Sequence, residues 1–114
     1  MPYINSDLTI KLTEDKKEKI KEKLGELISI LPGKSEDWLF VGFNDNKTLY
    51  FRGEKKERAA VVEVKICGSV SRESKENLTG AICNLLKDEL NIEGENIYVI
   101  FHEIDDWGYN GTLF

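Results

Sequence analysis

Pro2 is the residue with the most distinctive potential chemistry in this sequence, because it directly follows Met1. Removal of an initiator methionine before a small residue leaves proline with a free secondary amine. The reference pKa of a chain-start amine is about 7.7–8.0, and burial or a neighbouring cation lowers it further. A neutral amine near pH 7 can act as a general base. Many proteins begin with Met-Pro, so the pair identifies a candidate only.

The sequence offers little other catalytic chemistry. It contains no Gly-rich phosphate loop and no Gly-x-Ser-x-Gly nucleophile elbow. Cys67 and Cys83 do not form a Cys-x-x-Cys pair, and we interpret both as small core residues. His102 is the only histidine, which excludes a His-rich zinc site, and we expect it at a strand end without a catalytic role. We therefore expect neither a metal nor a cofactor.

Length and composition place the chain in one broad class. Its 114 residues fit a single domain over 1–114. Hydrophobic residues make up 40% and charged residues 32%, which disfavours a disordered tail and a membrane protein. The formal charge of −5 disfavours nucleic acid as a partner. No apolar run is long enough to span a bilayer, and the first residues lack a signal peptide's pattern, so we expect a cytoplasmic protein.

Hydrophobic periodicity predicts two helices among several strands. The first helix follows an N-cap at Thr13 and stops at Pro32-Gly33, and the second spans 71–90 with Asn91 as its C-cap. Lysines and glutamates alternate along the first helix, which is typical of a solvated face. The predicted strands are 2–12, 38–43, 48–51, 59–70 and 97–101, with a charged loop at 53–58 and a turn followed by a short extended piece after residue 105.

The order strand, helix, strand occurs once in each half of the chain. Each such unit places its two strands parallel, with the helix on one face. We therefore predict an α+β fold, or α/β sandwich, in which two β-α-β repeats form a four-stranded mixed sheet with both helices on one face. The other face is then uncovered although its strands are apolar, which favours oligomerisation.

An ordered series of short segments carries a family resemblance. These segments are Met1-Pro2-Tyr3-Ile4-Asn5, Gly33-Lys34, Phe51-Arg52-Gly53, Ile97-Tyr98-Val99 and Trp107-Gly108-Tyr109-Asn110-Gly111-Thr112-Leu113-Phe114. Together they resemble the macrophage migration inhibitory factor family of the tautomerase superfamily, over the whole chain. The resemblance implies a homotrimer whose three sheets form a central barrel with the helices outside. It also implies keto–enol tautomerisation of a small enol or keto acid such as phenylpyruvate.

The resemblance assigns roles to five residues. Pro2 matches the catalytic base, and Lys34 matches the lysine that holds the substrate carboxylate. Cys67 occupies the place whose backbone N–H contacts substrate. Tyr98 matches a tyrosine contributed by a neighbouring subunit, and Phe114 matches an aromatic wall of the pocket. Lys34 would also disfavour protonation of a nearby Pro2 amine.

The sequence departs from the family pattern at three places. Ile100 replaces an asparagine, which removes one polar contact to the far end of the substrate. Ala59 and Val62 replace a Cys-x-x-Cys pair, so thiol oxidoreductase chemistry is not transferred. Bulky Trp107 before the C-terminal glycine would narrow the pocket entrance.

Two alternatives to a tautomerase stay open. One is a non-catalytic trimeric interaction protein of the cytokine-like kind, for which family members can be exported without a leader. The other is a dehalogenase or decarboxylase of the same superfamily, which would need extra Arg or Glu groups around the proline.

Overall fold

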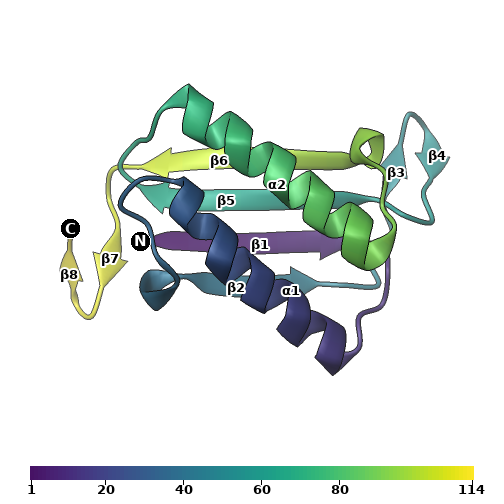
Figure 1. Ribbon diagram of the computed structural model, residues 1–114, viewed down its shortest axis with the longest axis horizontal. Coiled ribbons are helices and arrows are strands. Elements are labelled where there is room, and N and C mark those ends of the chain that lie inside the picture. Colours follow the sequence, from purple (N-terminus) through teal and green to yellow (C-terminus); the bar gives the residue numbers. More distant parts are fainter.

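Two helices pack on one face of a four-stranded mixed sheet in the computed structural model, which describes residues 1–114 (Figure 1). The helices are α1 (Glu14–Leu27) and α2 (Arg72–Leu90). In spatial order, the strands are β2 (Phe40–Asn44), β1 (Pro2–Leu8), β5 (Ala60–Cys67) and β6 (Ile97–Ile104). The outer pairs β1–β2 and β5–β6 are parallel, and the central pair β1–β5 is antiparallel. This confirms the two predicted β-α-β repeats.

The helix ends follow the predicted capping chemistry. The Thr13 hydroxyl accepts a hydrogen bond from the Lys16 N–H at 3.1 Å, as an N-cap does. Asn91 takes a left-handed conformation (φ 54°) and closes α2 as its C-cap. The first helix is shorter than predicted: α1 ends at Leu27, and the chain continues as a 3-10 turn over Ile28–Ile30 before Pro32.

Several predicted strand bounds differ from the structure: β5 ends at Cys67 rather than residue 70, and β6 continues to Ile104 rather than ending at residue 101. The first strand ends at Leu8 rather than Leu12. The second begins at Phe40, because residues Glu36–Trp38 form a 3-10 turn. The predicted charged loop at 53–58 contains strand β4 (Glu54–Lys55), which pairs with β3 (Tyr50–Phe51) in a hairpin. Backbone hydrogen bonds of a tight turn hold this hairpin, so its strands need no apolar pattern.

The core lies between the sheet and the helices. Alternate residues of the two central strands point into it, so Ile4, Val64 and Ile66 are fully buried. They meet the apolar stripes of α1 and α2, represented by Leu24 and Leu78. Neither helix is both long and apolar enough to cross a bilayer.

The sheet face opposite the helices carries both polar and apolar side chains. Its outward positions include Asn5, Glu63 and Lys65, and the His102 ring nitrogen lies 3.0 Å from the Glu63 carboxylate. His102 therefore sits within β6 rather than at its end. Apolar side chains share this face, since Phe40, Tyr98 and Ile100 are exposed on it, so the open face is mixed and part of the predicted apolar surface is present.

Candidate active site

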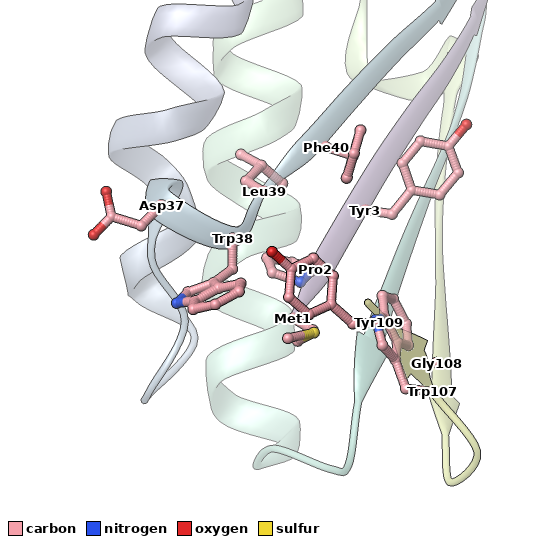
Figure 2. Close-up of a pocket in the computed structure, with 10 residues that line it drawn as sticks. All are labelled: Met1, Pro2, Tyr3, Asp37, Trp38, Leu39, Phe40, Trp107, Gly108 and Tyr109. Carbon is pink, nitrogen blue, oxygen red and sulfur yellow. The ribbon is translucent and has the colours of Figure 1, made fainter. Parts of the chain in front are cut away.

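Pro2 begins β1 and is buried, paired in register with Ile66 of β5. It lies against an open cavity of about 850 Å³ at the end of the sheet where the C-terminal hairpin also lies (Figure 1). The cavity is lined mainly by apolar and aromatic side chains: Met1, Pro2, Tyr3, Asp37, Trp38, Leu39, Phe40, Trp107, Gly108 and Tyr109. Figure 2 shows Pro2 and Met1 in the middle of this group.

Aromatic rings form the walls around Pro2. Trp38, from the 3-10 turn before β2, meets Tyr109 edge-on with ring centroids 5.3 Å apart. Phe114 stacks on Tyr109, with centroids 6.0 Å apart. Such ring pairs add stabilisation beyond the area that they bury. Phe114 therefore packs on a wall residue without lining the cavity itself, whereas Trp107 lines the cavity directly.

The C-terminal hairpin holds these rings in place. It consists of β7 (Gly108–Tyr109) and β8 (Thr112–Leu113), joined by Asn110 and Gly111. Both turn residues have positive φ (51° and 87°), as in the type I′ turn that Asn-Gly favours. The Phe114 N–H also donates to the Trp107 carbonyl at 2.9 Å. The hairpin formed by residues 108–112 therefore positions the Tyr109 ring at the cavity.

Lys34 and Cys67 lie next to Met1, which lines the cavity. Gly33 has a φ of 77°, which favours glycine and lets the chain turn sharply after the first helix. The Lys34 ammonium then donates to the Cys67 carbonyl at 2.9 Å. The Cys67 N–H donates to the Met1 carbonyl at 3.1 Å. One cation and one backbone donor therefore converge where the chain begins.

The chain-start amine lies in surroundings that disfavour its protonation. Burial lowers the pKa of the Met1 amino group below its usual value, and the positive charge of Lys34 lowers it further. Asp37 is the only carboxylate in the cavity lining, and its side chain points away from Pro2 (Figure 2). An amine at this position is thus held toward its neutral, proton-accepting form.

Tyr98 and Ile100 lie away from Pro2 within one chain. Tyr98 is paired with Val61 at the start of β5, whereas Pro2 is paired with Ile66 near its end. Five residues of strand span roughly 17 Å. Tyr98 instead contacts Phe51 of the β3–β4 hairpin, at the opposite end of the sheet (Figure 1). A single chain brings Pro2, Lys34, Cys67, Trp107 and Phe114 together, but not Tyr98 or Ile100.

The whole chain matches one protein family. The model of the family described as Macrophage migration inhibitory factor (MIF) covers residues 1–114. The chain belongs to the MIF family. No curated protein matches the chain in sequence.

Solved structures of MIF homologues share the fold. MIF2 of Leishmania major is 27% identical with a TM-score of 0.92, over 100% of this chain and 97% of that chain. The MIF-like protein of Entamoeba histolytica is 27% identical with a TM-score of 0.86, over 99% of this chain and 98% of that one. Pt0534, crystallised after inactivation by 2-oxo-3-pentynoate, has a TM-score of 0.84 over 96% and 93% of the two chains. At 15% identity, that last likeness concerns the fold alone.

Sequence patterns do not identify two residues that line this cavity, Trp38 and Tyr109. The apolar pattern places Trp38 in a strand, although it lies in the 3-10 turn that aims it at Tyr109. The family motif includes Tyr109 without giving it a role. The Asn110-Gly111 turn signal is present in the sequence and predicts a hairpin that presents the preceding tyrosine.

No group of three His, Cys, Asp or Glu side chains is arranged to hold a metal ion.

Proposed function

We propose that this protein is a keto–enol tautomerase of the phenylpyruvate tautomerase type, with the Pro2 amine as its general base once Met1 is removed. The observation that carries the proposal is the environment of the chain start, where burial and Lys34 lower the pKa of an amine. Pro2 is the next residue along the chain and begins β1 beside the same Lys34 and Cys67 backbone, so its free amine would lie close to the same positive charge.

The contacts of Met1 indicate how an acid substrate would bind. The Met1 carbonyl oxygen takes the hydrogen bond of the Cys67 N–H. Removal of Met1 would free that donor, and the Lys34 charge lies next to it. A carboxylate fits a site with one cation and one backbone N–H. We therefore assign Lys34 and the Cys67 backbone to the substrate's carboxylate.

The rest of the cavity suits an aryl group. Trp38, Tyr109 and Trp107 offer aromatic faces and edges, against which an aromatic side chain of the substrate would pack. In the reaction, the neutral Pro2 nitrogen takes the proton of the enol hydroxyl. It then returns that proton to the neighbouring carbon, which becomes the CH₂ next to the new carbonyl. The net charge and the redox state are unchanged, so the step needs no co-reactant.

We also propose that the working form is a homotrimer with sites between subunits. Both outer strands, β2 and β6, have an unpaired edge, which is open to pairing with another chain. Tyr98 is 56% exposed and too far from Pro2 of its own chain to share its cavity. A neighbouring copy can supply it, together with Ile100. Light scattering at micromolar concentration should give a trimer, and a stable monomer would contradict the assembly and remove Tyr98 from the site.

Kinetics of wild type and Pro2→Ala test the proposed base. Intact-mass measurement first verifies that Met1 is absent from both proteins. Positioned proton transfer contributes roughly 10²–10⁴-fold, so Pro2→Ala should lose activity on phenylpyruvate on that scale while staying folded. Full activity with an unchanged pH profile in Pro2→Ala would exclude Pro2 as the base. A folded wild type without activity would favour the non-catalytic, cytokine-like alternative.

A covalent probe offers a second route to the same nitrogen. 2-Oxo-3-pentynoate, the compound that inactivates Pt0534, is an acetylenic 2-oxo acid. Its alkyne accepts a neutral amine by conjugate addition, in which nitrogen bonds to carbon and its proton moves to the adjacent alkyne carbon. The Cys67 thiol also adjoins the chain start, so Cys67→Ala is the matched control.

A further inference from the structure

Arg52 lies at the tip of the β3–β4 hairpin in an unusual backbone conformation for a side chain of its size. Arg52 and Gly53 both have positive φ (54° and 77°), as in a type I′ turn. Such turns favour Asn-Gly, and the left-handed region is strained for a long side chain. The turn geometry therefore does not favour arginine at position 52. We look instead to the chemistry of the Arg52 side chain.

Arg52 and Tyr98 both contact the ring of Phe51. The Arg52 guanidinium lies over the Phe51 ring, 5.3 Å from its centroid. Phe51 in turn meets Tyr98 edge-on, with centroids 5.6 Å apart and planes at 79°. Phe51, Tyr98 and Tyr50 line a small apolar hollow of about 110 Å³ beside the hairpin. The guanidinium thus belongs to the same cluster as Tyr98.

The positive charge of Arg52 is uncompensated in this chain. Glu54 and Glu57 follow Arg52 closely in the sequence, yet none of the ion pairs in the structure includes Arg52. Its guanidinium donates no hydrogen bond to another residue either, unlike Arg58, which donates to the Leu90 carbonyl at 2.7 Å. A free guanidinium has the planar fork that binds a carboxylate.

We propose that Arg52 of a neighbouring subunit is a second anion-binding residue of the active site, so that the preferred substrate is a 2-oxo acid with a second carboxylate at its far end. This inference rests on the proposed function, since Tyr98 brings the hairpin to the neighbour's Pro2 cavity only in the assembly. Lys34 holds the carboxylate next to the reacting carbons, and Arg52 binds the distal one. Asp37 does not oppose this second charge, because its carboxylate points away from Pro2 (Figure 2).

A matched pair of substrates tests this proposal: phenylpyruvate, and phenylpyruvate with a carboxylate at the para position of its ring. The readout is the ratio of their kcat/KM values. In wild type the ratio should favour the dicarboxylate. In Arg52→Asn it should fall roughly tenfold, as expected for loss of one charged hydrogen bond.

Arg52→Asn also separates a substrate contact from a structural role. Asparagine favours the left-handed turn, so the thermal midpoint of this variant should equal or exceed that of wild type. Arg52→Lys keeps the charge and should retain part of the preference. Arg72→Asn removes an exposed arginine at the start of α2 and should leave the ratio unchanged.

Three results would overturn the proposal. An unchanged ratio in an active Arg52→Asn variant would contradict it while leaving the tautomerase function intact. Dissociation of that variant in light scattering would make Arg52 an interface residue instead. Inactivity of Met1-free wild type toward both acids would overturn the proposed function and, with it, the role of Arg52.

Discussion

Replacement of Lys34 by glutamine should weaken substrate binding. The contacts of Lys34 in the structure set limits on the expected loss. The Lys34 ammonium is partly buried and donates to the Cys67 carbonyl at 2.9 Å, and no carboxylate of the chain neutralises it. Hydrogen bonds to charged groups contribute about 1.5–3 kcal/mol. Loss of one such contact to the substrate carboxylate corresponds to roughly a 10- to 150-fold fall in kcat/KM, mostly through KM.

The same substitution should move the pH profile in a defined direction. Lys34 contributes to lowering the pKa of the chain-start amine, after the larger effect of burial. The base works in its neutral form, so activity rises with pH through its pKa. Without the Lys34 charge that pKa rises, and the ascending limb of the profile should shift toward higher pH. Lys34→Arg keeps the charge and should keep the limb near its wild-type position.

Steady-state kinetics with phenylpyruvate across a pH series measure both effects. Lys21→Gln is the matched control, because it removes a lysine on the solvated face of α1. Thermal unfolding identifies any damage from the unpaired Cys67 carbonyl. A Lys34→Gln enzyme with unchanged KM, or with an ascending limb shifted toward lower pH, would refute the assignment of Lys34 to the site.

Three further predictions concern the fold. Burial acts to raise the pKa of Asp7, but hydrogen bonds from Asn44 and Lys47 outweigh it and hold that pKa below its usual value. The stability that Asp7 gives is therefore present above about pH 4 and lost as pH falls through its folded pKa, and Asp7→Asn should flatten that loss in acid denaturation curves. Thr13→Ala removes the N-cap and should lower the free energy of unfolding by about 1 kcal/mol in urea titrations; no change would contradict the cap. Leu78→Ala, at a fully buried position, should cost about 3 kcal/mol in the same assay, and a cost below about 1 kcal/mol would contradict its place in the core.

Local sequence signals predict the helices and the order of the main strands. Thr13 and Asn91 have the residue types that cap helices, and both act as caps in the structure. Boundaries are less accurate, because the apolar residues Ile10 and Leu12 continue the strand-like pattern after β1 has ended at Leu8. Hydrophobic periodicity indicates which face of a strand or helix is buried. It does not indicate where the backbone pairing of a strand ends.

In the β3–β4 hairpin, the apolar residues of β3 predict a strand, but the pattern does not predict β4. Its turn places Arg52 at a position that usually takes asparagine, so the sequence lacks the turn signal that marks the C-terminal hairpin. Its charged residues then indicate a loop. The open sheet face follows from the sequence in part: Glu63 and Lys65 alternate with buried valines, and apolar Phe40 and Ile100 share that face in the structure.

The family resemblance predicts that Pro2, Lys34 and Cys67 lie together, and one chain does bring them to a common place. The sequence alone cannot reveal that Trp38 and Tyr109 meet across the cavity, because their contact depends on a 3-10 turn and a hairpin far apart in the chain. The proposed place of Tyr98 depends on a second copy of the chain, so one chain leaves it at the far end of the sheet.

Mass spectrometry after treatment with 2-oxo-3-pentynoate tests the central claim, a neutral Pro2 amine in the active site, most directly. We expect one adduct per chain of Met1-free protein, mapped by fragmentation to Pro2 and formed equally in Cys67→Ala. Labelling should slow as pH falls and the amine becomes protonated, and phenylpyruvate should protect against it. An adduct confined to Cys67 or Lys34, with the Pro2 nitrogen unmodified, would contradict the account.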